Sequence, residues 1–394
     1  MNLLLRSYQF MFKLYICLLL LLFKPIAIMA ETQRQTIMAI GIPLADHYAG
    51  IVAYEKYRDR MQYADYQFKI LPGPALVRAY FRSQPDVDIA FNVSPMVMDM
   101  FANKANFRWI SLIHRDGNAL VINHLMNTKV KLNSDRKMRR PDEKVANAIR
   151  FFKQKTGKPL EIAIPSPLAT HTTILYKYLK ENGLSFGYRI AEDTDVLLRV
   201  VKPPKSPVYL KTKAARAEAV AFEQSLPWAE IVETSRYGHV AWYSKDVMQH
   251  ESGHVECIII AKDEVIKHKR PALQEVINYI HQAGRDIEIA RKQGGEALET
   301  IVVMIRKHIP SHTREAIIQS LRADLNVINY LNLNVDVNAK SSFKEIMDLA
   351  FEAGFIQTKI DIDALADSSF STDITISENT LVKHIKKQDS YQDN

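Results

Sequence analysis

Three apolar runs that each lead through a short turn into a helical pattern are the main feature of the chain. They are residues 37–47 (IMAIGIPLADH), 87–96 (VDIAFNVSPM) and 161–171 (EIAIPSPLATH). Each run predicts a buried strand, and the Pro, Ser, Thr and Asp residues that follow it predict the start of a helix. A helix start offers free backbone N–H groups and a partial positive charge. Several such starts that meet at one place favour a site for a small anion.

Strand and helix patterns alternate over most of the chain. Strand patterns lie at residues 66–71, 87–93, 107–114, 197–201 and 217–222, and helical patterns lie at residues 47–61 and 74–82 and begin again at Thr170 and Pro271. Alternation of this kind predicts mostly parallel sheets covered by helices. A polar stretch at residues 127–144 interrupts the alternation, which restarts at Leu160. We therefore expect an α/β fold with a second α/β lobe.

The first 30 residues have the pattern of a signal peptide. Basic residues precede an unbroken apolar run at residues 14–23, and Ala30 can end a cleavage site. We therefore expect a cleavable signal peptide at residues 1–30 and export of the mature chain. The alternative is a chain anchored to the inner membrane by an uncleaved leader, because Lys24 directly after the apolar run is unusual in a cleaved one.

Charge and cysteine content narrow the classes of partner. The formal net charge is +8, and the mature chain keeps 8 − 3 = +5, because three basic residues lie in the leader. The densest basic stretch, residues 129–140, contains no aromatic side chain, so we expect no nucleic-acid partner. After the leader Cys257 is the only cysteine, which excludes an internal disulfide. A G-x-S-x-G elbow and a phosphate-binding P-loop are both absent from the sequence, so we expect no serine hydrolase, no nucleotide chemistry and no cofactor.

Five segments, taken in order, carry a resemblance to a known family. They are residues 42–56 (IPLADHYAGIVAYEK), 88–96 (DIAFNVSPM), 162–179 (IAIPSPLATHTTILYKYL), 200–230 (VVKPPKSPVYLKTKAARAEAVAFEQSLPWAE) and 351–370 (FEAGFIQTKIDIDALADSSF). Together they resemble the periplasmic solute-binding proteins of ABC importers for nitrate, bicarbonate, taurine and alkanesulfonates, the NMT1-like family. The Pro-rich turn before Thr170 and His171 is similar to the nitrate and bicarbonate branch.

The resemblance implies the two-lobed type II periplasmic binding protein fold, with each lobe a mostly parallel sheet flanked by helices and a hinge between them. The implied division places lobe 1 at residues 31–120 plus 239–345 and lobe 2 at residues 121–238. A C-terminal helical segment at residues 346–377 and a flexible tail at residues 378–394 are expected to follow.

The resemblance also implies a function that is not catalytic. A small anionic or zwitterionic ligand, an oxyanion of the nitrate, bicarbonate or sulfonate type, would bind in the cleft between the lobes. The protein would act in the periplasm and deliver the ligand to ABC permease and ATPase subunits, with the membrane involved only through the permease. A periplasmic ligand sensor that takes no part in transport is an alternative on the same fold.

Two positions depart from the family pattern. Leu226 stands where the nitrate and bicarbonate branch commonly has Glu, so a carboxylate is missing. The charged residue that helps to set the preference between nitrate and bicarbonate falls near Glu256 or Cys257, and neither supplies a fixed cation to balance nitrate. The ligand can therefore differ from those of the branch.

Two of the predicted helix starts supply the first site candidates. Ser94 and Pro95 have the pattern of an N-cap followed by a proline at the first helical position, which leaves the next N–H groups free for an anion. Thr170 and His171 have the same form in the second lobe, where the His171 ring could donate to a ligand oxygen. The alternatives are an ordinary capped helix and a structural histidine.

The remaining ligand-binding candidates are Asp46, His47, Asn118, Trp228 and Glu256. Asp46 is expected to cap the first helix, and His47 to face either the cleft or the core. Asn118 follows a glycine near the predicted crossing between the lobes, so it is a candidate hinge residue. Trp228 could form a wall of the pocket, although a tryptophan after a turn more commonly serves packing.

One motif favours a different class of protein. Residues 250–254 (HESGH) match H-E-x-x-H, in which two histidines on one face of a helix bind zinc and the glutamate activates water. The alternative function is therefore a zinc metallopeptidase that uses His250 and His254. Gly253 and the apolar run that follows predict a loop before a strand, which disfavours this reading. A weaker form is an adventitious or regulatory metal site at His250, His254 and Glu256.

Overall fold

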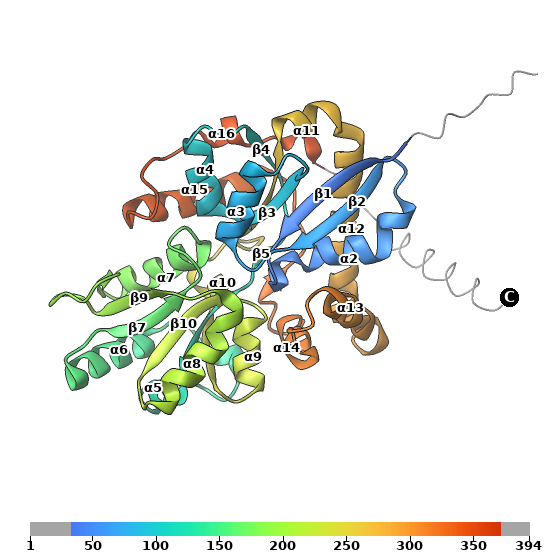
Figure 1. Cartoon of the computed structure of the whole chain (residues 1–394). Coiled ribbons are helices and arrows are strands. Elements are labelled where there is room, and N and C mark those ends of the chain that lie inside the picture. Colours follow the sequence, from blue (N-terminus) through green and yellow to red (C-terminus); the bar gives the residue numbers. More distant parts are fainter. Residues whose placement is uncertain (1–32, 372–394) are drawn as a thin grey trace, which may run out of the picture. The chain divides into compact units, whose positions relative to one another are not determined.

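The computed structural model describes residues 33–371, in which helices cover two larger sheets and a short two-stranded one (Figure 1). The expected signal peptide at residues 1–30 and the expected tail at residues 378–394 lie outside these described residues. Among the described helices none is long and apolar enough to cross a membrane.

The first sheet consists of five strands. They are β1 (Gln35–Gly41), β2 (Ala64–Ile70), β3 (Ile89–Val93), β4 (Phe107–Leu112) and β12 (Cys257–Lys262), in the order β2-β1-β3-β12-β4. As the alternating pattern predicts, β1 runs parallel to β2 and to β3. Strand β12 runs antiparallel to β3 and β4. Its first residue, Cys257, lies beside Val93, the last residue of β3, so β12 begins at the edge where the parallel strands end.

The second sheet consists of six strands. They are β6 (Asn118–Asn123), β7 (Leu160–Ile164), β8 (Phe186–Gly187), β9 (Val196–Val200), β10 (Val220–Ser225) and β11 (Gly238–Tyr243), in the order β11-β6-β10-β7-β9-β8. Parallel pairing joins β10, β7, β9 and β8. Strand β6 is antiparallel to both β10 and β11. The short sheet pairs β5 (Arg115–Asp116) with β13 (Ile328–Asn329).

Sheet membership corrects two of the expected domain boundaries. The chain leaves the first sheet after β4, enters the second at β6, and returns to the first at β12 after β11. The expected boundary after residue 120 therefore cuts through β6, and the boundary after residue 238 assigns β11 to the wrong sheet. The reason is that both strands are almost wholly buried, so their residue pattern does not show which sheet they join.

Helices cover the strands. They are α2 (Tyr48–Tyr57), α3 (Pro74–Ser83), α4 (Ser94–Ala102), α5 (His124–Val130), α6 (Glu143–Thr156), α7 (Thr170–Glu181), α8 (Ser206–Ala215), α9 (Trp228–Thr234), α10 (Ser244–Val247), α11 (Asp263–His268), α12 (Arg270–Gln293), α13 (Gly295–His308), α14 (Arg314–Ser320), α15 (Val337–Glu352) and α16 (Ile362–Leu365). Proline at the start of α12 and the apolar stripe that follows it confirm the predicted helix, whose buried face packs on α2.

Short 3-10 turns complete the list of helical elements. They are η1 (Ala45–His47), η2 (Arg58–Arg60), η3 (Arg136–Met138), η4 (Pro203–Lys205) and η5 (Ser368–Phe370). The first of them, η1, follows β1 directly and carries Asp46 and His47. The helix that the sequence pattern predicts at residues 47–61 is observed as α2, which begins one residue later, at Tyr48, and ends at Tyr57.

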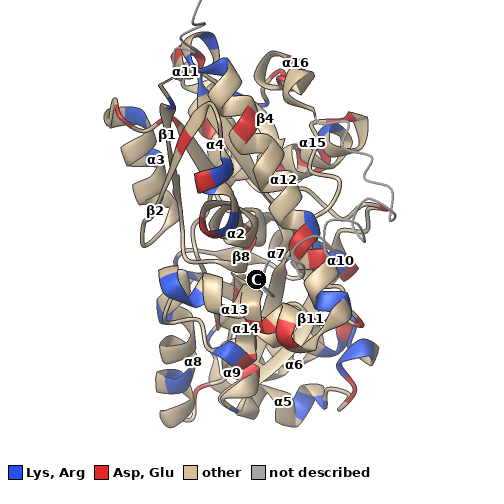
Figure 2. Cartoon of the chain, turned by 90° about the vertical axis from the view of Figure 1, so that its right-hand side faces the viewer, with Lys and Arg blue, Asp and Glu red and all other residues tan. Residues whose placement is uncertain are grey.

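Acidic and basic residues are interspersed along the helices in Figure 2. Many of them pair at close range, such as Lys56 with Asp286 at 2.8 Å and Lys344 with Asp348 at 2.7 Å. Exposed pairs such as Lys344 with Asp348 contribute little to stability, because water screens them.

Gly117 allows the chain to turn at the first crossing between the sheets. It has φ +98°, and an added Cβ would lie 3.0 Å from Ile328 Cδ1 and 3.3 Å from the His114 ring. We expect Gly117→Ala to lower the free energy of unfolding by roughly 1–3 kcal/mol, since it forces strained backbone into a packed position. Urea denaturation measures the change. The control is Gly73→Ala, where φ is 174° and nothing lies within 4 Å, so stability should hold. Equal stability of the two variants would contradict the prediction.

Candidate functional site

A group of buried polar side chains gathers where strands of the first sheet end. Asp46 lies in η1 after β1, and His114 follows β4. Glu256 stands directly before β12, and Cys257 is its first residue. Because β12 is antiparallel, its start lies at the edge where the parallel strands have their carboxyl ends. This edge is where open α/β sheets commonly bind ligands.

Three residues of the second sheet and its helices meet this group. Asn118 is the first residue of β6 and Ser225 is the last of β10, and the two lie opposite each other in the antiparallel pair. His171 lies in the first turn of α7, which follows β7. We call Asp46, His114, Asn118, His171, Ser225, Glu256 and Cys257 the inner cluster. All seven are buried, with at most 1% of their surface exposed.

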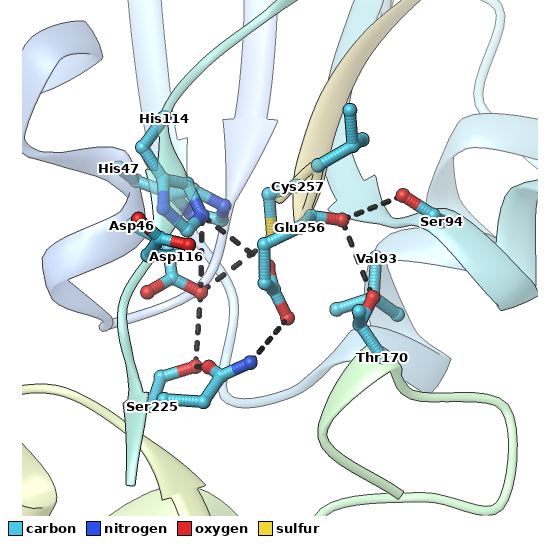
Figure 3. Close-up of polar contacts among 12 residues, drawn as sticks. Asp46, His47, Val93, Ser94, His114, Asp116, Thr170, Ser225, Glu256 and Cys257 are labelled. Atoms are coloured by element: carbon cyan, nitrogen blue, oxygen red, sulfur yellow. Dashed lines mark hydrogen bonds and ion pairs between the residues drawn. The ribbon is translucent and has the colours of Figure 1, made fainter. Parts of the chain in front are cut away.

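Hydrogen bonds within the inner cluster join the two sheets (Figure 3). Ser225 Oγ donates to Asp46 Oδ2 at 2.9 Å, and Asn118 Nδ2 donates to Glu256 Oε1 at 3.5 Å. His171 contributes twice, through a short contact of its Nε2 with Ser225 Oγ and through Nδ1, which lies 3.1 Å from Glu256 Oε1. The second sheet therefore contacts one oxygen of each carboxylate.

The other contacts of the carboxylates come from their own side of the site. His114 Nε2 lies 3.2 Å from Glu256 Oε2 and 3.5 Å from Asp46 Oδ2. The Cys257 thiol donates to Asp46 Oδ2 at 3.5 Å. Within residues 33–371 the ion-pair partners of Asp46 and Glu256 are histidines. The site thus holds two buried carboxylates without a lysine or arginine partner.

Burial and mutual contact shift the pKa values of these groups. Burial alone lowers the pKa of an imidazole, but Asp46 and Glu256 raise the pKa of His114 above its ordinary value. Burial alone raises the pKa of a carboxyl, but His171 and His114 lower the pKa of Glu256. Burial, followed by the neighbouring carboxylates, raises the pKa of Cys257. His114 is therefore a cation between two carboxylates, and Cys257 is a neutral thiol.

Several buried polar atoms of the site have no hydrogen-bond partner. They include Asp46 Oδ1 and His114 Nδ1. A buried polar group without a partner costs free energy, and each such atom in a native structure calls for an explanation. One explanation is a ligand that binds where the two sheets meet and supplies the missing hydrogen bonds.

Ser94 and Thr170 contact the backbone of Glu256, a member of the inner cluster. Both hydroxyls donate to the carbonyl oxygen of Glu256, at 2.7 Å and 3.3 Å (Figure 3). Neither is the N-cap that the sequence pattern predicts, because Val93 and Ala169 hold the N-cap positions of α4 and α7. The Ser94 N–H also donates to this carbonyl, at 3.1 Å. Pro95 follows within the first turn of α4 and is buried.

The structure corrects the capping role expected of Asp46 and gives His47 and Trp228 contacts with the backbone. Asp46 does not cap α2, whose N-cap is His47 without a side-chain hydrogen bond. His47 Nδ1 contacts the backbone of Ile42 at 2.9 Å and 3.0 Å, burial lowers its pKa to about 4, and the ring packs against Phe91. Trp228 Nε1 donates to the Pro43 carbonyl at 2.9 Å. His47 and Trp228 thus support the backbone around the site and are not seen among the inner-cluster contacts.

Sequence reasoning missed His114 and Ser225 and gave Cys257 no ligand role. Each is a polar residue at the end of a buried strand, His114 after β4 and Ser225 at the end of β10. That position is the signal that could have identified them, because the carboxyl ends of parallel strands meet at one edge.

The H-E-x-x-H segment does not form a helix. Residues 251 and 252 form a turn, and residues 249–250 and 253–254 are irregular. His250 Nε2 lies 2.9 Å from Glu345 Oε2, whereas His254 is buried and its Nε2 lies 2.9 Å from Ser244 Oγ. The two rings have separate partners, so the segment lacks the helical face that a zinc peptidase requires.

Comparisons with known proteins agree with this architecture. The structure is similar to the periplasmic nitrate-binding protein NrtA from Synechocystis PCC 6803, with 16% identity, a TM-score of 0.69 and coverage of 86% of this chain and 87% of that one. It is similar to the ligand-binding component of an ABC-type import system from Staphylococcus aureus with zinc bound, with 15% identity, a TM-score of 0.66 and coverage of 87% and 100%.

A third similar structure is the alkanesulfonate-binding protein SsuA from Xanthomonas axonopodis pv. citri bound to MOPS, with 10% identity, a TM-score of 0.60 and coverage of 84% of this chain and 98% of that one. At these identities the likeness shows the fold, so the expected α/β fold of two-lobed periplasmic binding proteins is confirmed. The absence of catalysis stays a prediction.

Sequence comparison assigns the family. No curated protein sequence matches the chain significantly. The model of the NMT1-like family matches residues 32–302, which is more than half of the 394 residues. The chain belongs to the NMT1-like family.

Proposed function

We propose that this chain acts in the periplasm as the solute-binding component of an ABC importer and holds its ligand at the inner cluster. The observation that supports the proposal is the convergence of both sheets on buried carboxylates and histidines, several of whose polar atoms lack a partner. Ligands of α/β proteins bind outside the carboxyl ends of the strands, where these residues lie.

Closure around the solute would follow from the same contacts. Ser225, Asn118 and His171 reach from the second sheet to Asp46 and Glu256. A ligand that adds contacts to both sides favours the closed arrangement over an open one by its difference in affinity for the two. An ABC permease and its ATPase would then receive the closed form.

The charge of the inner cluster indicates the class of solute. Asp46 and Glu256 repel a free anion, and their charged partner His114 leaves one negative charge uncompensated. The cluster therefore favours a small solute that brings a positive charge or several N–H or O–H donors. A free nitrate or sulfonate is the second candidate, because structural relatives are described as nitrate-binding and alkanesulfonate-binding.

A thermal-shift screen of the full chain tests the proposal. A ligand that binds the folded state alone must raise Tm. The panel comprises nitrate, nitrite, bicarbonate, sulfate, taurine, alkanesulfonates and small organic amines. We expect a rise in Tm with an amine-bearing or donor-rich solute. A rise with nitrate or sulfonate alone would replace the first ligand class with the second, and silence across the panel would contradict solute binding of either class.

Replacing Thr170 and His171 by alanine should weaken binding of the solute that the screen identifies by roughly tenfold or more. The variant removes the contacts of His171 with Ser225 and the Glu256 carboxylate and the hydrogen bond from Thr170 to the Glu256 carbonyl. Tm of the ligand-free protein should stay nearly unchanged. Isothermal titration calorimetry measures the affinity. The control is His308→Ala, which removes a histidine that pairs with Glu55 outside the inner cluster. Unchanged affinity in the double variant would show that the ligand binds elsewhere.

A further inference from the structure

We propose that Asp46, His114, Glu256 and Cys257, which we call the donor set, bind a divalent transition-metal ion, with Zn²⁺ as the probe. The inference rests on the proposed function, because it names what the inner cluster holds. The donor set is distinct from His250 and His254, the pair that the sequence motif indicates.

The chemistry of the donor set suits such an ion. It offers one imidazole nitrogen, two carboxylate oxygens and one cysteine sulfur, and all four residues are buried. Binding of the ion would release the proton of the His114 imidazolium and the proton of the Cys257 thiol to solvent, because both ligands bind in their deprotonated forms. Zinc accepts these three kinds of ligand in protein sites, usually four at a time. Calcium and magnesium take oxygen ligands instead, so the sulfur and nitrogen favour a transition metal.

The geometry is close to that of a formed site. One ligand atom of each residue can be chosen so that all four lie within 4.8 Å of one another. His114 Nε2 lies 3.2 Å from Glu256 Oε2 and 3.5 Å from Asp46 Oδ2, and Cys257 Sγ lies 3.5 Å from Asp46 Oδ2. Zinc–ligand bonds of about 2.0–2.3 Å in a tetrahedron place ligand atoms roughly 3.3–3.7 Å apart. Three of the six separations match this spacing and the others are at most 4.8 Å, so the ligand atoms need to move only slightly inward to hold one ion.

The surroundings are arranged as an outer shell. Glu256 turns Oε2 toward His114, whereas its Oε1 meets His171 and Asn118 of the second sheet. Asp46 accepts from Ser225. Hydrogen bonds of this kind orient metal-binding carboxylates in known sites. Figure 3 shows His114, Asp46, Glu256 and Cys257 turned toward one another, with Ser225 beside Asp46.

An independent observation points to a missing ligand. Asp46 Oδ1 is a buried carboxylate oxygen of the donor set and has no hydrogen-bond partner, whereas Oδ2 has contacts with Ser225, His114 and Cys257. An ion that the Asp46 carboxylate binds through both oxygens would give Oδ1 the partner that it lacks. The four ligands all lie on the first sheet's side, and side chains of the second sheet contact only their carboxylate oxygens.

Metal analysis of the full chain tests the inference. The chain is stripped with a chelator and dialysed against Zn²⁺, and bound zinc is measured by elemental mass spectrometry. We expect one zinc per chain, with affinity at least tenfold weaker in Cys257→Ala and in Asp46→Asn. His250→Gln is the control and should bind zinc as the unaltered chain does. Circular dichroism in the presence of chelator verifies that each variant folds without metal. If Cys257→Ala does not fold, Cys257→Ser replaces it in the measurement.

Cobalt gives a second, spectroscopic measurement. Co²⁺ bound to a thiolate has a charge-transfer absorption that cobalt bound to nitrogen and oxygen lacks. This absorption should appear in the unaltered chain and in His250→Gln and be lost in Cys257→Ser. Failure to bind stoichiometric zinc, or binding that is unaffected by Cys257→Ser and Asp46→Asn, overturns the proposal.

The same samples separate this inference from the proposed function. If only zinc raises Tm, the ion is itself the solute. If an organic or inorganic anion raises Tm of the zinc-loaded chain but not of the metal-free chain, the ion is the anchor of that anion. Both results support the metal site. A solute that binds the metal-free chain while zinc does not bind overturns the metal site and leaves the proposed function standing. Absence of binding by zinc and by every solute contradicts both.

Discussion

Replacing Arg291 by methionine should lower the free energy of unfolding by roughly 3–5 kcal/mol, the cost of removing one partner from a buried charge pair. The Arg291 side chain is 1% exposed and lies 3.0 Å from Glu288. It also donates to the carbonyls of Leu321, Arg322 and Ile328, at 3.1, 2.9 and 2.8 Å. Methionine fills similar volume but leaves these acceptors and the Glu288 charge without a donor.

The loss should extend to the binding site, because Arg291 holds the segment that supports it. Glu288 accepts from the Tyr330 N–H at 3.1 Å, and the Tyr330 hydroxyl donates to the carbonyl of Ala45, next to Asp46, at 2.6 Å. Urea denaturation gives the unfolding free energy, and the solute affinity of the folded fraction gives the effect on the site.

The matched control is Arg314→Met, which removes an arginine from an exposed pair with Glu299. It should leave Tm nearly unchanged, since water screens exposed pairs. If Arg291→Met and Arg314→Met changed stability equally, the network around Arg291 would not carry the stability assigned to it here.

The strand and helix patterns predict much of this fold because burial dictates them locally. The start of α3 at Pro74 and of α12 one residue before Pro271 follows from proline's fixed φ and missing N–H. The patterns do not show which strands pair with one another. β6 and β11 are not among the predicted strands, and their membership in the second sheet depends on antiparallel pairing between segments more than 100 residues apart.

At the site, too, the sequence predicts where residues lie better than it predicts what their side chains contact. Ser94 and Thr170 lie beside the inner cluster as predicted, yet their hydroxyls serve the Glu256 carbonyl and not the ends of their helices. The contact between Ser225 and Asp46 joins residues 179 positions apart. Such a contact follows from the register of two sheets, which local sequence does not encode. The expectation of an anion site rested on helix starts and on the family resemblance. Asp46 and Glu256 were candidates separately, but their meeting with His114 in one buried group depends on the fold.

Glu223 should make the unfolding free energy fall as the pH rises above the ordinary range of a glutamate. Its side chain is fully buried in β10, both oxygens lack a partner, and burial raises its pKa well above the ordinary value. Between the ordinary pKa, about 4.3, and the raised one, the folded chain holds a proton that the unfolded chain releases. The free energy of unfolding therefore falls progressively between the ordinary and the raised pKa, and it falls no further above the raised pKa.

Glu223→Gln removes the titration but keeps a polar group, whereas Glu223→Met removes both. Relative to the unaltered chain, we expect Glu223→Gln to gain stability at pH 8 and to lose most of this gain at pH 4, where the carboxyl is neutral in both states. Glu223→Met should keep at pH 4 the part of its gain that comes from removing a buried polar group without a partner. At pH 8 the gain in Glu223→Met should amount to roughly 1–3 kcal/mol, the cost of burying a polar group without a partner, and to a rise in Tm of about 2 °C or more. Thermal unfolding at the two pH values measures the difference.

The matched control is Glu161→Gln, which alters a partly buried glutamate that pairs with Lys213 and Arg199. Burial alone raises the pKa of a glutamate, but Lys213, Tyr209 and Arg199 lower the pKa of Glu161, so its loss should destabilise the protein at pH 8 and have less effect at pH 4. The two glutamine variants should therefore shift Tm in opposite directions at pH 8. If Glu223→Gln instead lowered Tm at pH 8 as Glu161→Gln does, Glu223 would be an ionised residue with a partner in the folded protein. Because it stands two residues from Ser225 on the same face of β10, that partner would lie next to the inner cluster.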